Sequence, residues 1–238
     1  QSHCFDVSIS AYIDVALGKI LFRSRIPLRI APATKIAQIF FNKRVKQHRS
    51  LVEKREFEYN LDLLRAFESH LTLGFERPLL KLSTHKETKP FIIFHPGFGG
   101  SSDGNLSHDD YLKLAKKASE FIEIVFSFGP DDKVSKKYIQ EKLDFKAMIR
   151  DDFKSLFEFT SFIASSKLFV STSTGPMHLA GMTNTRTLSF FGDTLFASDK
   201  RWGTISDEAC QHNFTVPENY SSEVYERIEN KLIELIHA

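Results

Sequence analysis

Two glycine- or hydroxyl-rich segments of the chain have residue types that suit a phosphate group. The first segment carries Gly99, Gly100, Ser101 and Ser102, whose backbone N–H groups and hydroxyls can approach an anion closely. Its glycine spacing differs from the GxGxxG of dinucleotide sites, and it has no P-loop lysine. A plain strand-to-helix turn would have the same composition, so both interpretations stay open for this segment alone.

The second segment ends a predicted strand with four hydroxyl residues and then begins a helix with Gly175 and Pro176. Ser173 or Thr174 is predicted as the N-cap, and Pro176 suits the first turn. The free N–H groups and the positive dipole end of such a helix suit a diphosphate, and His178 lies about one turn further on. A capped helix with a structural histidine explains the same residues.

Two further turns follow predicted strands. Asp131, in Gly-Pro-Asp-Asp, could accept hydrogen bonds from ribose hydroxyls, although Pro-Asp is also common in turns for local reasons. The segment 191–194, with Trp202, could form the wall of a nucleobase pocket. The sequence has no HExxH, GxSxG or metal-ligand cluster, so we expect no metal site and no serine-hydrolase chemistry. No tightly bound cofactor is expected either.

Alternating strands and helices position these segments. Apolar periodicity predicts an α/β fold with strands at 5–10, 26–30, 91–95, 122–128, 167–171 and 187–192, and helices at 13–22, 33–41, 56–67, 109–121, 152–164, 175–182 and 223–236. Such alternation indicates a doubly wound parallel sheet, in which ligands bind at the carboxyl ends of the strands. The glycine-containing loops above should therefore gather on one edge.

Composition and charge narrow the classes of protein. The 238 residues are 42% hydrophobic and 26% charged, which is ordinary globular composition, and no apolar run is long enough to span a membrane. Two isolated cysteines, Cys4 and Cys210, fit a reducing cytoplasm. Residues 1–60 hold 11 Lys/Arg against 5 Asp/Glu, which indicates an anionic partner or a solvated basic face. RNA-binding aromatic motifs and zinc-finger spacings are missing, so no nucleic-acid partner is expected.

Together these segments resemble glycosyltransferase family 9, the lipopolysaccharide heptosyltransferases. The stretch 169–192, with its Thr-Gly-Pro-Met-His block, is the strongest match, and 91–117, 127–132 and parts of 5–64 also resemble the family. The resemblance implies a GT-B-like fold of two Rossmann-like doubly wound domains. Residues 1–75 would be the remainder of an incomplete amino-terminal acceptor-side domain, 76–90 a linker, and 91–238 the donor-binding domain.

The resemblance also implies an inverting, metal-independent transfer of heptose from an ADP-activated donor to the inner core of lipopolysaccharide. It places Gly99, Gly100, Ser101 and Ser102 near the donor diphosphate and Asp131 near the ribose. Ser173, Thr174, Gly175 and His178 would form the donor site beside the diphosphate and sugar. Lys43, Arg44 and Arg49 are predicted to meet the anionic acceptor, and peripheral contact with the inner face of the inner membrane would follow.

Three departures from the family pattern keep alternatives open. Many members have Asp where Ser173 stands, and a Lys-x-Trp-Pro element where this chain has Gly104 to Ser107. The Gly-Asp-Val loop of the family, whose Asp is thought to be the general base, has no counterpart here, and we expect the base upstream of Gln1. A non-catalytic nucleotide-sugar-binding module, a transferase for another nucleotide sugar and, less favoured, a nicotinamide-dependent oxidoreductase are the competing hypotheses.

Overall fold

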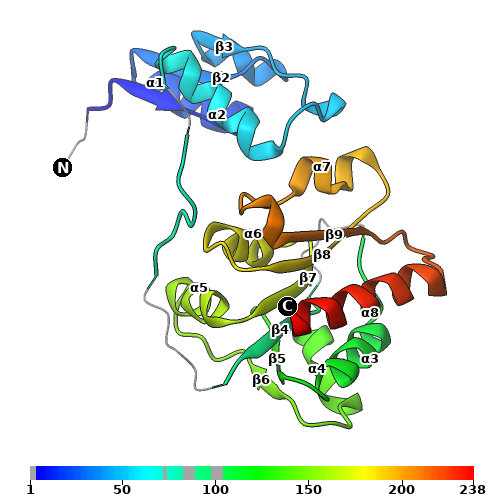
Figure 1. Ribbon diagram of the computed structural model, residues 1–238. Helices are drawn as coiled ribbons and strands as arrows, with labels where there is room; N and C mark the ends of the chain where they lie inside the picture. The colour runs from blue at the N-terminus through cyan, green and yellow to red at the C-terminus, as the bar shows by residue number, and fades with distance from the viewer. Residues whose placement is uncertain (1–3, 72–73, 83–88, 98–103) are drawn as a thin grey trace. The chain divides into compact units, whose positions relative to one another are not determined.

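The computed structural model describes residues 4–71, 74–82, 89–97 and 104–238. The chain divides into two compact units, Gln1–Gly74 and Phe75–Ala238, each built around its own parallel sheet (Figure 1). We call them unit 1 and unit 2. The α/β fold predicted from the sequence is confirmed in both.

Unit 1 has a three-stranded parallel sheet in the order β1-β2-β3, formed by Val7–Ile9, Leu28–Pro32 and Lys43–Val45. Helix α1 (Val15–Arg23) packs against η1 (Ile36–Phe40), a short 3₁₀ helix, and α2 (Glu56–Phe67) packs against β2 and β3. A small 3₁₀ turn, η2 (Arg49–Leu51), precedes α2. The bounds predicted for α2 are confirmed.

The helix predicted over 33–41 is wrong. Only the five residues of η1 are helical, because Lys35 has a φ of 57° and Phe41 returns to extended backbone at φ −107°. The basic residues that follow were not expected in a strand, yet Lys43 and Arg44 belong to β3. Apolar spacing over nine residues was compatible with a helix, but the backbone at both ends prevents a longer one.

Unit 2 has a six-stranded sheet in the order β6-β5-β4-β7-β8-β9, with every neighbouring pair parallel. Its strands are Met148–Arg150 (β6), Glu123–Ser127 (β5), Phe91–His95 (β4), Leu168–Thr172 (β7), Thr187–Phe191 (β8) and Gln211–Thr215 (β9). All residues of β4, β7 and β8 are buried, as continuous apolar runs in a parallel sheet require.

Helices cover both faces of this sheet. On one face the core includes residues of α3 (His108–Ala118), α4 (Lys133–Lys142) and α8 (Ser222–His237); on the other it includes residues of α5 (Leu156–Ser165) and α6 (Gly175–Met182). Figure 1 shows this layering. Along the chain, three short elements come between β8 and β9, namely η3 (Leu195–Ala197), α7 (Asp199–Trp202) and η4 (Glu208–Cys210). In the described part of the chain, no helix is long and apolar enough to cross a membrane.

Strand order reverses direction at β4, because β5 and β6 lie on one side of it and β7, β8 and β9 on the other. This is the topological switch point, where α/β sheets bind their ligands. His95, Ser127, Thr172 and Phe191 end the four central strands and therefore line the carboxyl edge of the sheet.

Gly104 makes a close backbone approach at this edge. An added Cβ would lie 2.2 Å from both the amide nitrogen of Gly192 and the carbonyl carbon of Phe191. The Thr172 hydroxyl donates to the Gly104 carbonyl oxygen from the end of β7. Only a residue without a side chain allows the segment that leads into α3 to pass so near β8.

Gly104→Ala is therefore expected to lower the free energy of unfolding by about 1–3 kcal/mol, the usual cost of overpacking a site whose neighbours are backbone. Urea denaturation measures this change. Gly175→Ala is the matched control, because nothing lies within 4 Å of its added Cβ. Equal stability of the two variants would contradict the close approach.

Candidate functional site

The start of α6 is the central feature of the carboxyl edge in unit 2. Thr174 occupies the N-cap position with φ −132° and ψ 169°, and a proline stands in the first turn. The N-cap predicted at Ser173 or Thr174 is confirmed at Thr174, but its side chain makes no cap hydrogen bond: the Thr174 hydroxyl donates to the carbonyl of Thr172 at 3.4 Å. The cap side chain therefore takes none of the first-turn N–H groups of α6, which suits an anion at this helix start.

Ser173 and Gly175 flank this N-cap. Ser173 is partly buried, and its N–H donates to the carbonyl of Phe190 at 3.0 Å, which ties the strand end to β8. Gly175 is exposed. The two residues and Thr174 are brought together by the backbone at one helix start, as the sequence pattern predicted.

His178 lies in the first turn of α6, half-buried, with its ring 6.4 Å from the ring of Trp202 at an interplanar angle of 61°. Burial lowers the pKa of His178 below its ordinary value of 6.5. The imidazole is neutral at pH 7, so it can donate or accept a hydrogen bond there without acting as a cation.

Two adjacent aspartates in the turn after β5 have different environments. Asp132 is partly buried: its Oδ2 accepts the Gly129 N–H at 2.7 Å and lies 3.6 Å from Nε2 of His95. An added Cβ on Gly97 would lie 2.2 Å from its Oδ1. Asp131 is exposed. Asp132 therefore holds the ends of β4 and β5 together, while the carboxylate of Asp131 stays accessible.

A hollow of about 450 Å³ opens beside this turn. It is lined by two residues of the turn and by polar residues, mostly from α4: Gly129, Pro130, Lys133, Lys136, Lys137, Gln140 and Asp151. Lys136 is paired with Asp151 across it. The hollow has a basic lining next to the exposed Asp131.

His95 was not predicted as a site residue, although it precedes the glycine-rich segment. It is buried at the end of β4, its Nδ1 lies 3.0 Å from the Ser127 hydroxyl, and its ring stacks on Phe169 at 5.9 Å. Burial lowers the pKa of His95, and the neighbouring Asp132 partly offsets this effect. No local sequence signal distinguishes such a histidine, because its partners come from β5 and from the start of α4.

Gly99, Gly100, Ser101 and Ser102 lie outside the described residues, so their predicted role near a diphosphate stays a prediction. The described residues contain no group of three or more His, Cys, Asp or Glu side chains placed to hold a metal ion.

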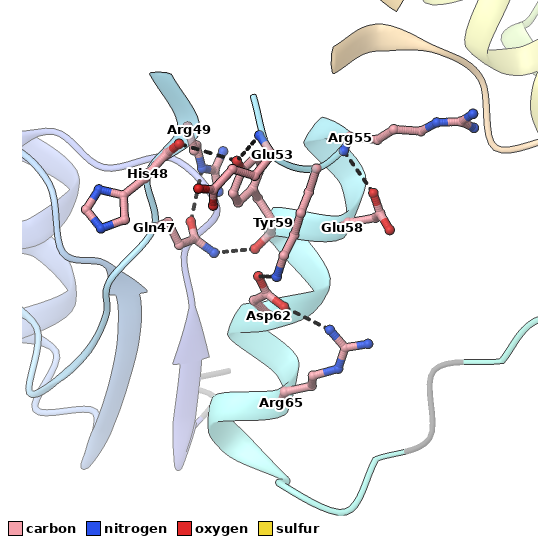
Figure 2. A network of polar contacts seen from close by, with 10 residues as sticks. Gln47, His48, Arg49, Glu53, Arg55, Glu58, Tyr59, Asp62 and Arg65 are labelled. Carbon is pink, nitrogen blue, oxygen red and sulfur yellow. Dashed lines mark hydrogen bonds and ion pairs between the residues drawn. The ribbon is translucent and has the colours of Figure 1, made fainter. Parts of the chain in front are cut away.

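Among the residues predicted for an acceptor, Arg49 has internal partners in unit 1. Its guanidinium pairs with Glu56, donates to Oε1 of Gln47 at 3.0 Å and to Oδ1 of Asn60 at 3.1 Å, and lies 5.6 Å from the Tyr59 ring. Figure 2 shows Arg49 within this polar network, beside Gln47 and Tyr59. Because Arg49 belongs to η2 and Glu56, Tyr59 and Asn60 belong to α2, these contacts hold η2 against α2.

Lys43 and Arg44 are exposed on β3, and the Arg44 Nε donates to the carbonyl of Phe41 at 3.0 Å. They lie within the strand, whereas Arg49 lies beyond its carboxyl end. The predicted contact of Lys43, Arg44 and Arg49 with an acceptor stays a prediction.

A doubly wound parallel sheet with an uncapped helix start at its switch point, in a chain that has a second unit built on a three-stranded parallel sheet, fits the two-domain plan of GT-B glycosyltransferases. A family model described as glycosyltransferase family 9 (heptosyltransferase) matches residues 24–232. The chain belongs to this family, as its sequence motifs predicted.

Known relatives agree with this assignment. A Haemophilus influenzae protein whose description assigns it provisionally to the glycosyltransferases is 34% identical over 245 residues, covering 92% of this chain and 69% of its own length. The E. coli heptosyltransferase WaaC, solved with ADP, has a TM-score of 0.72 at 17% identity, covering 99% of this chain and 74% of its own. E. coli ADP-heptose lipopolysaccharide heptosyltransferase II has a TM-score of 0.75 at 17% identity, covering 97% and 76%. The GT-B-like fold is confirmed.

Arg49→Ala is expected to lower the free energy of unfolding by about 1–3 kcal/mol, because it leaves the half-buried Glu56 and the buried Gln47 without their charged partner. Chemical denaturation followed by far-UV circular dichroism measures the change. Lys46→Ala, at an exposed position just after β3, is the control and should stay within about 0.5 kcal/mol of wild type. A neutral Arg49→Ala would show that this side chain is free for another role.

The buried histidines predict how stability depends on pH. Burial lowers the pKa below 6.5 for His95, His108, His178 and His212. As pH falls through 6.5 the unfolded chain binds protons that the folded chain does not, so the free energy of unfolding should decrease from pH 7 toward pH 5. His95→Gln should reduce this slope in urea unfolding measured across that range. An unchanged slope would contradict a neutral buried His95.

Proposed function

We propose that the carboxyl edge of unit 2 binds the diphosphate of an ADP-activated heptose, and that the protein transfers this sugar to the inner core of lipopolysaccharide with inversion and without a metal. The observation that carries the proposal is the uncapped start of α6, with Thr174, Gly175 and His178 at the switch point of the sheet. Family membership supports the transferase class, and one relative, E. coli WaaC, solved with ADP and also with ADP-2-deoxy-2-fluoro heptose, supports the donor.

In this account the acceptor hydroxyl loses its proton to a base and its oxygen bonds to the anomeric carbon. The bond between that carbon and the diphosphate breaks, and ADP leaves with the electron pair. First-turn N–H groups of α6 stabilise the charge that develops on the leaving diphosphate. His178 adds a neutral hydrogen-bond donor, and Asp131 accepts from the ribose hydroxyls. We assign no residue of this chain as the base.

Gly104 favours one alternative, a nucleotide-sugar-binding module without catalytic activity. Many family members carry a lysine at the corresponding place, and the close approach of Gly104 to Phe191 and Gly192 leaves no room for a side chain there. A cation that would face the diphosphate is thus missing from this segment. An assay of heptose transfer from ADP-heptose to a Kdo-terminated lipopolysaccharide core distinguishes the binding module from the enzyme, because only the enzyme forms product. Equal transfer rates with and without EDTA would support a reaction that needs no metal.

The donor site is tested by titrating the chain with ADP and following the fluorescence of Trp202, the only tryptophan in the sequence. Its ring lies beside His178, so saturable quenching is expected. His178→Ala should weaken ADP binding by about tenfold, the effect of losing one hydrogen bond to a charged group. His237→Ala, at the end of α8, is the control and should bind ADP as wild type does. A folded chain that binds no ADP, or that prefers UDP, would contradict the proposed donor.

A further inference from the structure

His95, Ser127 and Asp132 form a chain of polar contacts at the carboxyl ends of β4 and β5. The Nδ1 atom of His95 lies 3.0 Å from the Ser127 hydroxyl, and its Nε2 atom lies 3.6 Å from Oδ2 of Asp132. His95 ends β4, Ser127 ends β5, and Asp132 directly precedes α4. A serine, a histidine and an aspartate thus lie next to one another, in the order that hydrolytic triads also have.

Burial excludes a nucleophilic role for this serine. Ser127 is fully buried, and the ring of His95 lies between the rings of Phe159 and Phe169, at centroid distances of 6.1 Å and 5.9 Å. A nucleophilic hydroxyl has to reach its substrate, and this one cannot. Aromatic neighbours would pack as well on an aliphatic side chain, so the polar contacts of the two ring nitrogens are what distinguish a histidine at this position.

The contacts of Asp132 connect His95 to the turn that carries Asp131. Oδ2 of Asp132 accepts the Gly129 N–H at 2.7 Å, and the Asp132 N–H donates to the carbonyl of Gly129 at 3.2 Å, so the turn 129–132 is closed on both sides. Asp131 lies within this closed turn, and its side chain is exposed. The direction in which Asp131 leaves the turn therefore depends on where Asp132 is held.

One tautomer of His95 suits both of its polar neighbours. Burial lowers the pKa of His95, so the ring is neutral at pH 7 and carries a single N–H hydrogen. With this hydrogen on Nε2, the ring presents an N–H to the carboxylate of Asp132, and Nδ1 accepts the hydroxyl hydrogen of Ser127. Ser127 thereby favours the tautomer that faces Asp132, because the hydrogen bond at one ring nitrogen decides what the other can do.

We propose that His95 is a positioning residue for nucleotide binding, which acts through Asp132 on the turn that carries Asp131. The inference rests on the proposed contact of Asp131 with the donor ribose, and it gives a role to a side chain that is too deeply buried to touch the donor itself. Loss of the His95 contacts should therefore remove the ribose part of the donor affinity and leave the diphosphate part, which belongs to the start of α6.

The test is a double-mutant cycle followed by isothermal titration calorimetry, with ADP and pyrophosphate as separate probes because pyrophosphate lacks the ribose. His95→Leu and Asp131→Asn should each weaken ADP binding by about tenfold, the effect of losing one hydrogen bond to a charged group. The double variant should bind ADP no more weakly than either single variant, since both changes remove the same contact. Pyrophosphate should bind all three variants as it binds wild type.

Further variants separate positioning from stability. His95→Gln can still direct an N–H toward Asp132 and should retain ADP affinity, although it loses the imidazole. Ser127→Ala removes a single hydroxyl and therefore tests the same chain of contacts if His95→Leu does not fold; it should weaken ADP binding several-fold. His212→Leu, which changes a half-buried histidine of β9, is the control and should bind ADP as wild type does.

The proposal is overturned if folded His95→Leu or Ser127→Ala binds ADP as wild type does, or if pyrophosphate binding falls as much as ADP binding. Additive effects of His95→Leu and Asp131→Asn would also overturn it, and would leave the proposed donor site intact. A wild type that binds no ADP, or an Asp131→Asn variant with unchanged affinity, would contradict the proposed donor contacts together with this inference.

Discussion

The contact between Gly104 and the backbone of Phe191 and Gly192 is the constraint on which the donor side of this protein depends. It brings the segment before α3 against the end of β8, while Thr172 binds the same segment from the end of β7. With Asp132 joining the ends of β4 and β5, the carboxyl edge becomes one connected surface. The start of α6 lies on this surface with its first-turn N–H groups free of a side-chain cap.

The same constraint explains how this chain departs from its family. A side chain in place of Gly104 would need the backbone of β8 to move, so the lysine that the family resemblance implies for this segment has no room there. In the transfer we propose, the stabilisation of a leaving diphosphate would come from oriented N–H groups and neutral donors. Such dipoles are effective in a site that excludes water, because they do not reorganise as charge develops.

Much of the fold was accessible from the sequence because its signals are local. Helices α2 and α6 were predicted with their observed bounds, from apolar periodicity in one and from Gly-Pro after a hydroxyl run in the other. Strands β3, β6 and β9 were not predicted, since they are short or polar and lie at sheet edges. The helix expected over 33–41 failed because the backbone of Lys35 cannot be read from apolar spacing.

The sequence located the segments of the candidate site better than it identified which side chains in them are available for binding. Sequence motifs placed these strand ends and the start of α6 close to where the structure has them, but tertiary contacts decide which of two adjacent aspartates is engaged and which cation is held internally. The partner of Asp132 is His95, which lies far from it in the chain. The partner of Arg49 is Glu56, which belongs to a different helix.

A crystal structure of the chain with ADP tests the central claim most directly. The account predicts the diphosphate at the first turn of α6, within hydrogen-bond distance of its N–H groups and His178, with the ribose at Asp131. ADP bound away from the carboxyl edge of unit 2, or a diphosphate that leaves the start of α6 untouched, would contradict it.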